Sequence, residues 1–293
     1  MKVTSVLYLV IFIWKPQDIH SSTVPAEIQA LNDIYNSMGG TNWVGATNWP
    51  NGDPCLQSWR GVTCTGSTTT SIAQLNLYTF GLQGAFPASI SSLTSLFNLY
   101  VKGARISGDF AVLVSNLPTG MTNLGLYDNQ LSGTFPSSFC KFTRLSSLSV
   151  GTNQITGPLP SCLSTLTRLK QFYVSSNQLT GIPPDLSSSP SLSSVGLAGN
   201  LWNGTVPSWL GRLPLTFIDL ENSSFTDTTF PNFFANWNSL TYLGFGSVNL
   251  IGPIPESLIT SLTLLQTLLI RNSPFLTGPV PSNLGSLTRL TTL

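Results

Sequence analysis

The chain has 293 residues and a formal net charge of +1, and only 8% of its residues are charged. An average soluble domain carries about a quarter, so the surface here must rely on hydroxyl and amide groups, and electrostatic binding of nucleic acid is excluded. The one histidine, His20, lies in a segment that we expect to be removed. The remainder would lack imidazole, which excludes Ser-His-Asp and Cys-His catalysis and histidine metal sites. We expect no cofactor and no metal.

The first residues form a basic start followed by a mostly apolar run over residues 3–14. This run is too short to cross a bilayer comfortably, and it is typical of a secretory signal peptide. We assign residues 1–26 to this leader, with cleavage somewhere in 20–26. An uncleaved anchor or a disordered tail is the alternative. No later stretch is long and apolar enough to predict a membrane span.

Residues 27–71 form a unit of their own. Apolar residues recur at helical spacing over 27–38, which predicts a helix that Gly39 and Gly40 end. A turn-rich segment follows, with Trp43, Trp49, Trp59 and the cysteines Cys55 and Cys64.

From residue 72 the chain repeats one template, L-x-x-L-x-L-x-x-N-x-L-x-G, followed by an aliphatic residue or Phe and then Pro. The closing glycine recurs every 23 to 26 residues, at 84, 108, 133, 157, 181, 204, 252 and 278, with Asp227 in its place once. About nine copies predict a solenoid, because each copy can bury its apolar edge only against its neighbours. Residues 290–293 begin a tenth copy, so we expect the sequence to be a fragment of a longer protein.

The template assigns a physical role to each fixed position. Leu-x-Leu predicts a short strand with one buried face, and successive strands should form a parallel sheet. An asparagine after the strand can hydrogen-bond the backbone of adjacent turns. We expect this ladder across four central copies, at Asn129, Asn153, Asn177 and Asn200, because other residues replace it elsewhere. The second copy has Asp109 where the closing proline motif stands in the others.

The template resembles the plant-type subclass of leucine-rich repeat proteins, over residues 72–293, and residues 27–71 resemble the N-terminal cap of that subclass. The resemblance implies an α/β solenoid. A right-handed superhelix would carry a parallel β-sheet on its concave face, short 3-10 or helical turns on its convex side, and a helical cap. It also implies a Cys55–Cys64 disulfide that closes the cap. The family includes ectodomains of receptor-like kinases and receptor-like proteins, and polygalacturonase-inhibitor-like proteins.

Other residues fit an extracellular, oxidising location. Cys140 and Cys162 fall on the helical side of consecutive copies, offset by two residues. They could form a disulfide if their Cα atoms lie within about 7 Å, and two buried thiols are the alternative. Two sequons predict N-glycosylation at Asn203 and Asn222. We expect a secreted protein, or one on the outer face of the plasma membrane if a longer chain carries a C-terminal span.

The outward positions of the strands should line the concave face. Two of these positions in each copy supply the candidate ligand-binding residues Tyr78, Tyr100, Lys102, Tyr127, Tyr173, Asp219, Glu221 and Arg271. Tyrosine is a favoured recognition residue, so these side chains predict a groove, although an ordinary solvated sheet is the alternative. Glycines at 125, 151, 196, 244 and 246 favour the close approach of a flat ligand or reflect low constraint.

The pair Asp219 and Glu221 also suggests glycosidase chemistry, since two residues at i and i+2 of a strand lie roughly 7 Å apart. An open, wet face gives no reason for either pKa to rise, so we predict no enzyme activity. We expect an extracellular recognition module for a protein, peptide or glycan ligand. The alternative is a structural matrix, cell-wall or filament-forming repeat protein, which should show no special chemistry on its concave face.

Overall fold

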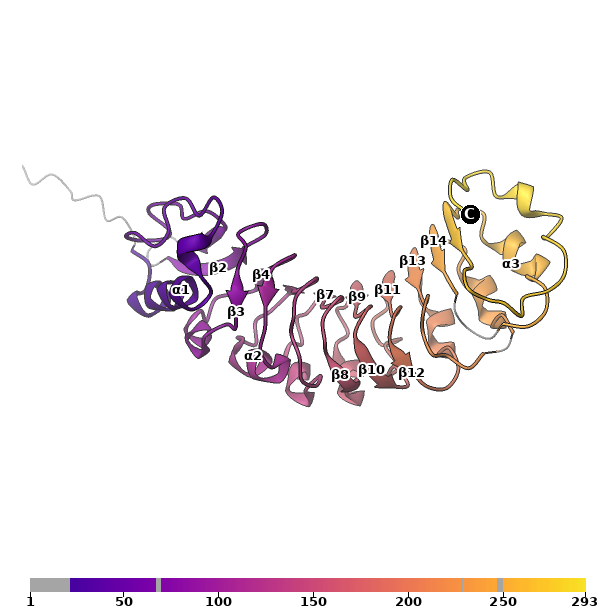
Figure 1. Cartoon of the computed structure of the whole chain (residues 1–293), viewed down its shortest axis with the longest axis horizontal. Coiled ribbons are helices and arrows are strands. Elements are labelled where there is room, and N and C mark those ends of the chain that lie inside the picture. The colour runs from indigo at the N-terminus through magenta and orange to yellow at the C-terminus, as the bar shows by residue number, and fades with distance from the viewer. Residues whose placement is uncertain (1–21, 67–69, 228, 247–249) are drawn as a thin grey trace, which may run out of the picture.

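The computed structural model describes residues 22–66, 70–227, 229–246 and 250–293. These residues form a curved solenoid with the long sheet along its concave side and short helices along its convex side (Figure 1). Residues 1–21 of the expected leader lie outside the described residues. Across the described ranges, no helix is long and apolar enough to cross a membrane.

The cap is built on helix α1 (Pro25–Ser37), which packs its buried face, Ala30, Leu31 and Ile34, against the first repeat. Proline at the first helical position is favourable because its missing N–H has no intrahelical partner there. The helix therefore begins two residues before the predicted start at residue 27. The chain leaves it through Gly39, whose φ of +75° is accessible to glycine at little cost.

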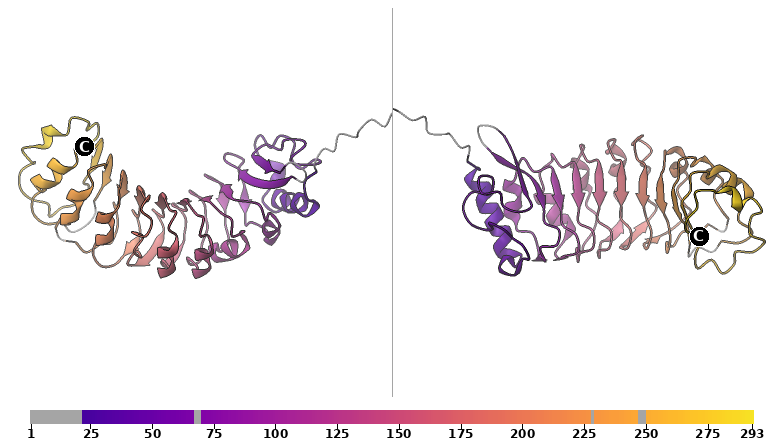
Figure 2. Two further views of the ribbon diagram at one scale, coloured as in Figure 1. Left: turned by 180° about the vertical axis from the view of Figure 1, so that it is seen from behind. Right: turned by 90° about the horizontal axis from the view of Figure 1, so that it is seen from above.

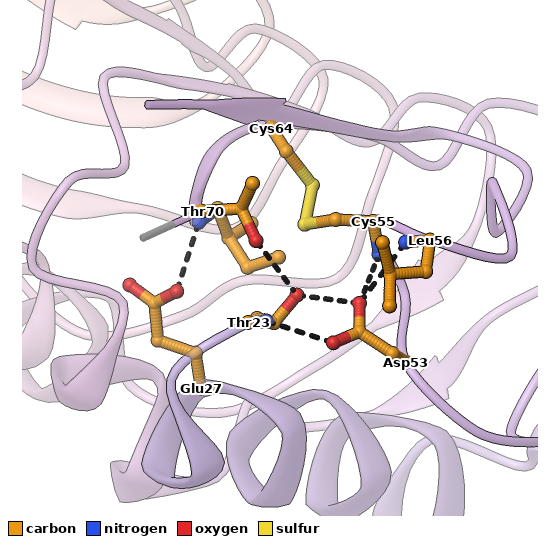
Figure 3. The surroundings of a disulfide bond; sticks show 8 residues. Thr23, Glu27, Asp53, Cys55, Leu56, Cys64 and Thr70 are labelled. Atoms are coloured by element: carbon orange, nitrogen blue, oxygen red, sulfur yellow. Dashed lines mark hydrogen bonds between the residues drawn. A yellow bond between two sulfur atoms is a disulfide. The ribbon is translucent and has the colours of Figure 1, made fainter. Parts of the chain in front are cut away.

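Two carboxylates fix the cap: half-buried Asp53 holds its loops together, and buried Glu27 joins it to the first repeat (Figure 3). Asp53 accepts hydrogen bonds from the backbone N–H and hydroxyl of Thr23, both at 2.7 Å, and from the N–H groups of Cys55 and Leu56. Glu27 is 2% exposed and accepts from the N–H of Ile72 at 2.9 Å. Residues 23–26, which we predicted as the end of the leader, thus form part of the cap.

The main sheet has ten strands among the described residues. The first pair is antiparallel and every later pair is parallel. In spatial order the strands are β1 (Val62–Thr65), β2 (Ser71–Asn76), β4 (Asn98–Tyr100), β6 (Asn123–Gly125), β7 (Ser147–Ser149), β9 (Gln171–Tyr173), β11 (Ser194–Gly196), β13 (Phe217–Asp219), β14 (Tyr242–Gly244) and β15 (Thr267–Leu269). The template predicted this arrangement except for β1, which the cap contributes.

Smaller elements complete each turn of the solenoid. Two short parallel sheets lie beside the main one, formed by β3 (Gln83–Gly84) with β5 (Arg105–Ile106), and by β8 (Thr156–Pro158), β10 (Gln178–Gly181) and β12 (Leu201–Trp202). The helical turns are η1 (Gly40–Asn42), η2 (Ala88–Ser92), α2 (Phe110–Asn116), η3 (Ser137–Lys141), η4 (Ser161–Thr165), η5 (Ser208–Arg212), η6 (Asn232–Asn236), α3 (Glu256–Ser261) and η7 (Leu284–Ser286). Most are single 3-10 turns that begin after a proline.

The repeat with Asp109 in place of the proline motif forms the α-helix α2 instead. The Asp109 carboxylate accepts from the N–H groups of Ala111 and Val112 and so caps the helix. In this copy the hydrogen bonds of Asp109 fix the start of the helix, whereas in the other copies the restricted φ of proline does so.

The asparagine ladder fills the inside of the turns after β6, β7, β9 and β11. Asn177, 8% exposed, donates to the carbonyls of Val150 and Val174, and its Oδ1 accepts from the N–H of Ile155. Asn129, Asn153 and Asn200 make the same bonds in their own copies. In the copy after Asn200, the buried Ser223 hydroxyl reaches the carbonyl of Leu197. Backbone groups that the tight turn leaves without strand partners are satisfied in this way.

Candidate ligand-binding groove

The main sheet lines the concave face (Figure 2), and the residues that alternate with its buried positions face outward there. In β13, for example, Ile218 points into the core while Phe217 and Asp219 point outward, and Glu221 follows two residues later. Neighbouring strands pair in register, so side chains at one position form a row along the solenoid.

A groove with a volume of about 570 Å³ runs along this face and crosses the region between β2 and β13. Six of the eight predicted residues line it: Tyr78, Lys102, Tyr127, Tyr173, Asp219 and Glu221. Tyr100 lines a smaller hollow of about 200 Å³ beside it. Arg271 lies beyond the groove and contacts it only through Glu221. Small side chains complete the walls, namely Ser149, Gly151, Thr152, Ser175, Ser176, Ala198, Gly199 and Asn222.

Tyrosines and one lysine form the end of the groove nearest the cap. The rings of Tyr78 and Tyr100 lie 6.2 Å apart, and the ammonium of Lys102 lies 5.2 Å from the centre of the Tyr127 ring. Burial, and then the neighbouring Tyr78, raises the pKa of Tyr100. A phenol held protonated can donate a hydrogen bond to a ligand.

Two carboxylates form the other end. Oδ1 of Asp219 accepts from the backbone N–H of Glu221 at 3.1 Å, and Oε1 of Glu221 lies 4.0 Å from Nε of Arg271. Burial, reinforced by the charge of Glu221, raises the pKa of Asp219 to about 6. Our expectation that neither pKa would rise on an open face is therefore wrong. Asp219 is half-buried because it leans over the bare Gly244 of the next strand.

The row of outward positions that holds Phe217 and Tyr242, beside these carboxylates, escaped the sequence analysis. The rings of Phe217 and Tyr242 stack 4.5 Å apart at 17°, and Tyr173 meets Phe217 edge-on at 5.7 Å. Burial, and then the charges of Asp219 and Glu221, raises the pKa of Tyr242 to about 12. Period-two alternation could have revealed this row, because the residue before the first buried position of each strand also points outward.

Polar side chains occupy the same row nearer the cap. The amide of Asn98 donates to Oε1 of Gln74 at 3.0 Å, and Asn123 donates to Oδ1 of Asn98 at 2.6 Å. Ser147 likewise donates to Oε1 of Gln171 at 2.8 Å. These bonds hold the amides in place on one side of the groove.

The concave glycines make room for neighbouring side chains of the protein itself. A Cβ on Gly125 would come within 2.7 Å of Tyr100 Cδ1, and one on Gly244 within 2.7 Å of Asp219 Oδ1. Gly246 is enclosed by the backbone of Arg271. Contacts within the protein therefore explain these glycines. The two predicted explanations, close approach of a flat ligand and low constraint, are not needed.

The remaining predicted sites lie at defined places. Disulfides join Cys55 to Cys64 and Cys140 to Cys162, with Cα–Cα distances of 5.9 and 6.0 Å. Asn203 is exposed directly after the edge strand β12. Asn222 is exposed at the acidic end and lines the groove. The two sequons therefore differ in their relation to the candidate site.

Comparisons with known proteins agree with this geometry. A family model described as leucine rich repeat N-terminal domain matches residues 24–65, and the model of the Leucine Rich Repeat matches residues 120–142 and 168–189. Protein STRUBBELIG-RECEPTOR FAMILY 3 from Arabidopsis thaliana is 28% identical over 147 residues, which are 49% of this chain and 18% of that protein. The matched region is thus less than a fifth of that relative.

Two solved Arabidopsis thaliana ectodomains have similar structures. The leucine-rich repeat ectodomain of the membrane receptor kinase GASSHO1/SCHENGEN3, in complex with CASPARIAN STRIP INTEGRITY FACTOR 2, has a TM-score of 0.76 at 27% identity. The alignment covers 91% of this chain and 32% of that one. The ectodomain of the receptor kinase HAESA, in complex with a peptide hormone, has a TM-score of 0.61 at 26% identity. The alignment covers 91% of this chain and 52% of that one.

The fold and the groove define a solenoid that carries a preformed concave surface. The chain is a leucine-rich repeat protein of the plant type, with the N-terminal cap of that family.

Proposed function

We propose that this chain is an extracellular recognition module that binds an extended peptide in its concave groove. The observation that carries the proposal is the groove itself, which draws its walls from several successive repeats. Side chains on a rigid sheet are already positioned, so binding loses little affinity to the ordering of the protein. The similar HAESA ectodomain is a complex with a peptide hormone, which supports a peptide as the ligand class.

Several features support an extracellular location, including the predicted leader with its apolar run over residues 3–14, the two disulfides and the sequons. The charged and aromatic side chains of the groove favour recognition over the structural alternative, for which we expected a plain concave face. The similarity is to receptor ectodomains, and we therefore propose a binding role without catalysis.

The test is to pan a random dodecapeptide phage library against the purified protein and to measure the affinity of synthetic versions of the enriched peptides. Ser149→Trp places a bulky ring in the middle of the groove and should abolish their binding. Thr167→Trp, at an exposed turn outside the groove, is the matched control and should leave affinity unchanged. If no enriched peptide is sensitive to Ser149→Trp, the proposed function is wrong.

A further inference from the structure

The groove has opposite charges at its two ends. Lys102 is the one cationic side chain among the described residues that line it, and Asp219 and Glu221 are the anionic ones. Lys102 is exposed on the chain segment after β4, and the two carboxylates belong to β13 and the residues after it. The strand order between them is β4-β6-β7-β9-β11-β13.

The two ends differ in how far their charge is already compensated. Oε1 of Glu221 lies 4.0 Å from Nε of Arg271, whereas within the described residues Asp219 has no ion pair and accepts a hydrogen bond from the N–H of Glu221. Lys102 likewise has no carboxylate within ion-pair distance in the described part of the chain, although the exposed Asp128 lies beside the next residue, Gly103. Its ammonium lies over the Tyr127 ring. A ligand can therefore supply the missing countercharge at each end.

The acidic end also offers the groups that a basic side chain binds. Tyr173, Phe217 and Tyr242 place aromatic rings next to Asp219. A guanidinium or ammonium group gains from aromatic faces and from a carboxylate at the same time. A neutral glycan would leave the charges of both ends without partners, which costs affinity. The charge pattern therefore favours a peptide over a neutral sugar.

Sheet geometry sets the separation that a ligand must match. Five strand-to-strand steps of about 4.8 Å separate the two ends by about 24 Å, which an extended chain spans in about seven residues. Resting on the proposed peptide-binding function, we propose that the groove selects an extended peptide with two opposite charges about seven residues apart. Its basic side chain lies on Asp219 and Glu221, and its acidic side chain lies on Lys102.

The acidic end should also make binding depend on pH. The groups that face Asp219 are Glu221, Tyr242 and Tyr173, with Arg271 behind Glu221. Burial raises the pKa of Asp219 to about 6, so its carboxylate gains charge as the pH rises through that value. A basic ligand group should then bind more tightly at pH 7 than at pH 5, by way of Asp219.

The experiment uses the same dodecapeptide selection and reads the sequences that are enriched. Wild-type protein should enrich peptides with one basic and one acidic residue at the separation given above. Asp219→Asn keeps the shape of the side chain and should weaken these peptides about tenfold. Asp185→Asn removes a carboxylate outside the groove and should leave them unchanged.

A change of specificity gives the sharper outcome. Lys102→Glu makes both ends acidic and should instead enrich peptides with two basic residues at the same separation. Peptides that lose binding to the Ser149→Trp variant are those that bind in the groove. If these peptides show no such charge pattern, the inference is wrong while the proposed function stands. If selection yields no peptide that Ser149→Trp blocks, the proposed function fails and the inference fails with it.

Discussion

The ring of Tyr173 lies over Gly196 of the adjacent strand, where a Cβ would come within 2.9 Å of Tyr173 Cδ1. Tyr100 over Gly125 and Asp219 over Gly244 repeat this relationship. Each pair is a large side chain in one copy and a bare backbone in the next. The shape of the concave face therefore depends on the order in which large residues and glycines follow one another along a row.

We expect Gly196→Ala to turn the Tyr173 ring out of its position and to weaken peptides that bind in the groove. The loss of stability should stay below the roughly 1–3 kcal/mol of an overpacked core, because Tyr173 is only half-buried and can rotate. Peptide affinity and urea unfolding measure the two effects. Gly120→Ala is the control, since its Cβ would meet nothing within 4 Å. Equal affinity of Gly196→Ala and wild type would contradict this role of the glycine.

The sequence predicted the repeated parts of the molecule well, for a physical reason. The buried leucines and the asparagine ladder recur at fixed positions. Each leucine pairs with the equivalent residue one copy away, such as Leu99 with Leu75 and Leu124, and each asparagine hydrogen-bonds the backbone of the preceding copy. One template therefore predicts most of the main sheet. Where a copy departs from it, as at Asp109, the local hydrogen bonds decide the outcome.

The groove was less predictable because its properties depend on how neighbouring side chains lean. The alternation of the strands indicated which residues point outward, but it did not show that Asp219 is half-buried over Gly244 or that Phe217 stacks on Tyr242. Burial then changes the acidity of Asp219. Such effects arise between copies, and no single copy contains them.

The ladder should contribute strongly to stability. Asn177→Ala leaves the buried N–H of Ile155 and the carbonyls of Val150 and Val174 without this side chain, which should lower the free energy of unfolding by about 2–4 kcal/mol. Ser273 occupies the same template position in a late copy and bonds only the nearby carbonyl of Arg271. Ser273→Ala should therefore cost less than about 0.5 kcal/mol. Similar losses in the two urea titrations would argue against the ladder as a stabilising element.

The Cys140–Cys162 disulfide links consecutive turns on the helical side of the solenoid, η3 and η4. It closes a loop with a sequence separation of 22, so replacing both cysteines with serine should cost about 3 kcal/mol through the greater freedom of the unfolded chain. Thermal unfolding of the double variant measures the loss. The repeat contacts remain, so we expect the far-UV circular dichroism spectrum to be preserved. An unchanged melting temperature would show that the bridge adds no constraint beyond those contacts.

The stability of the protein should fall as Asp219 becomes charged. Its pKa is about 6 in the folded protein and lower, near 3.8, as a free group, so the folded state binds more protons between these values. Linkage then requires the free energy of unfolding to decrease as the pH rises from about 4 to 6. This destabilising contribution is at most about 3 kcal/mol at pH 7, and contact of the half-buried side chain with solvent reduces it.

Asp219→Asn should remove this contribution and raise stability at pH 7, while leaving stability at pH 4 nearly unchanged. Urea titrations of both proteins across this pH range measure the difference. Asp185→Asn is a control of opposite sign. Although burial would raise the pKa of Asp185, hydrogen bonds from Ser187 and the Arg212 charge lower it, so its carboxylate stabilises the fold once ionised. That variant should lose a little stability at pH 7. If the free energy of unfolding of Asp219→Asn keeps the same dependence on pH, the titrating group lies elsewhere. The charge on Asp219 would then cost the folded protein almost nothing.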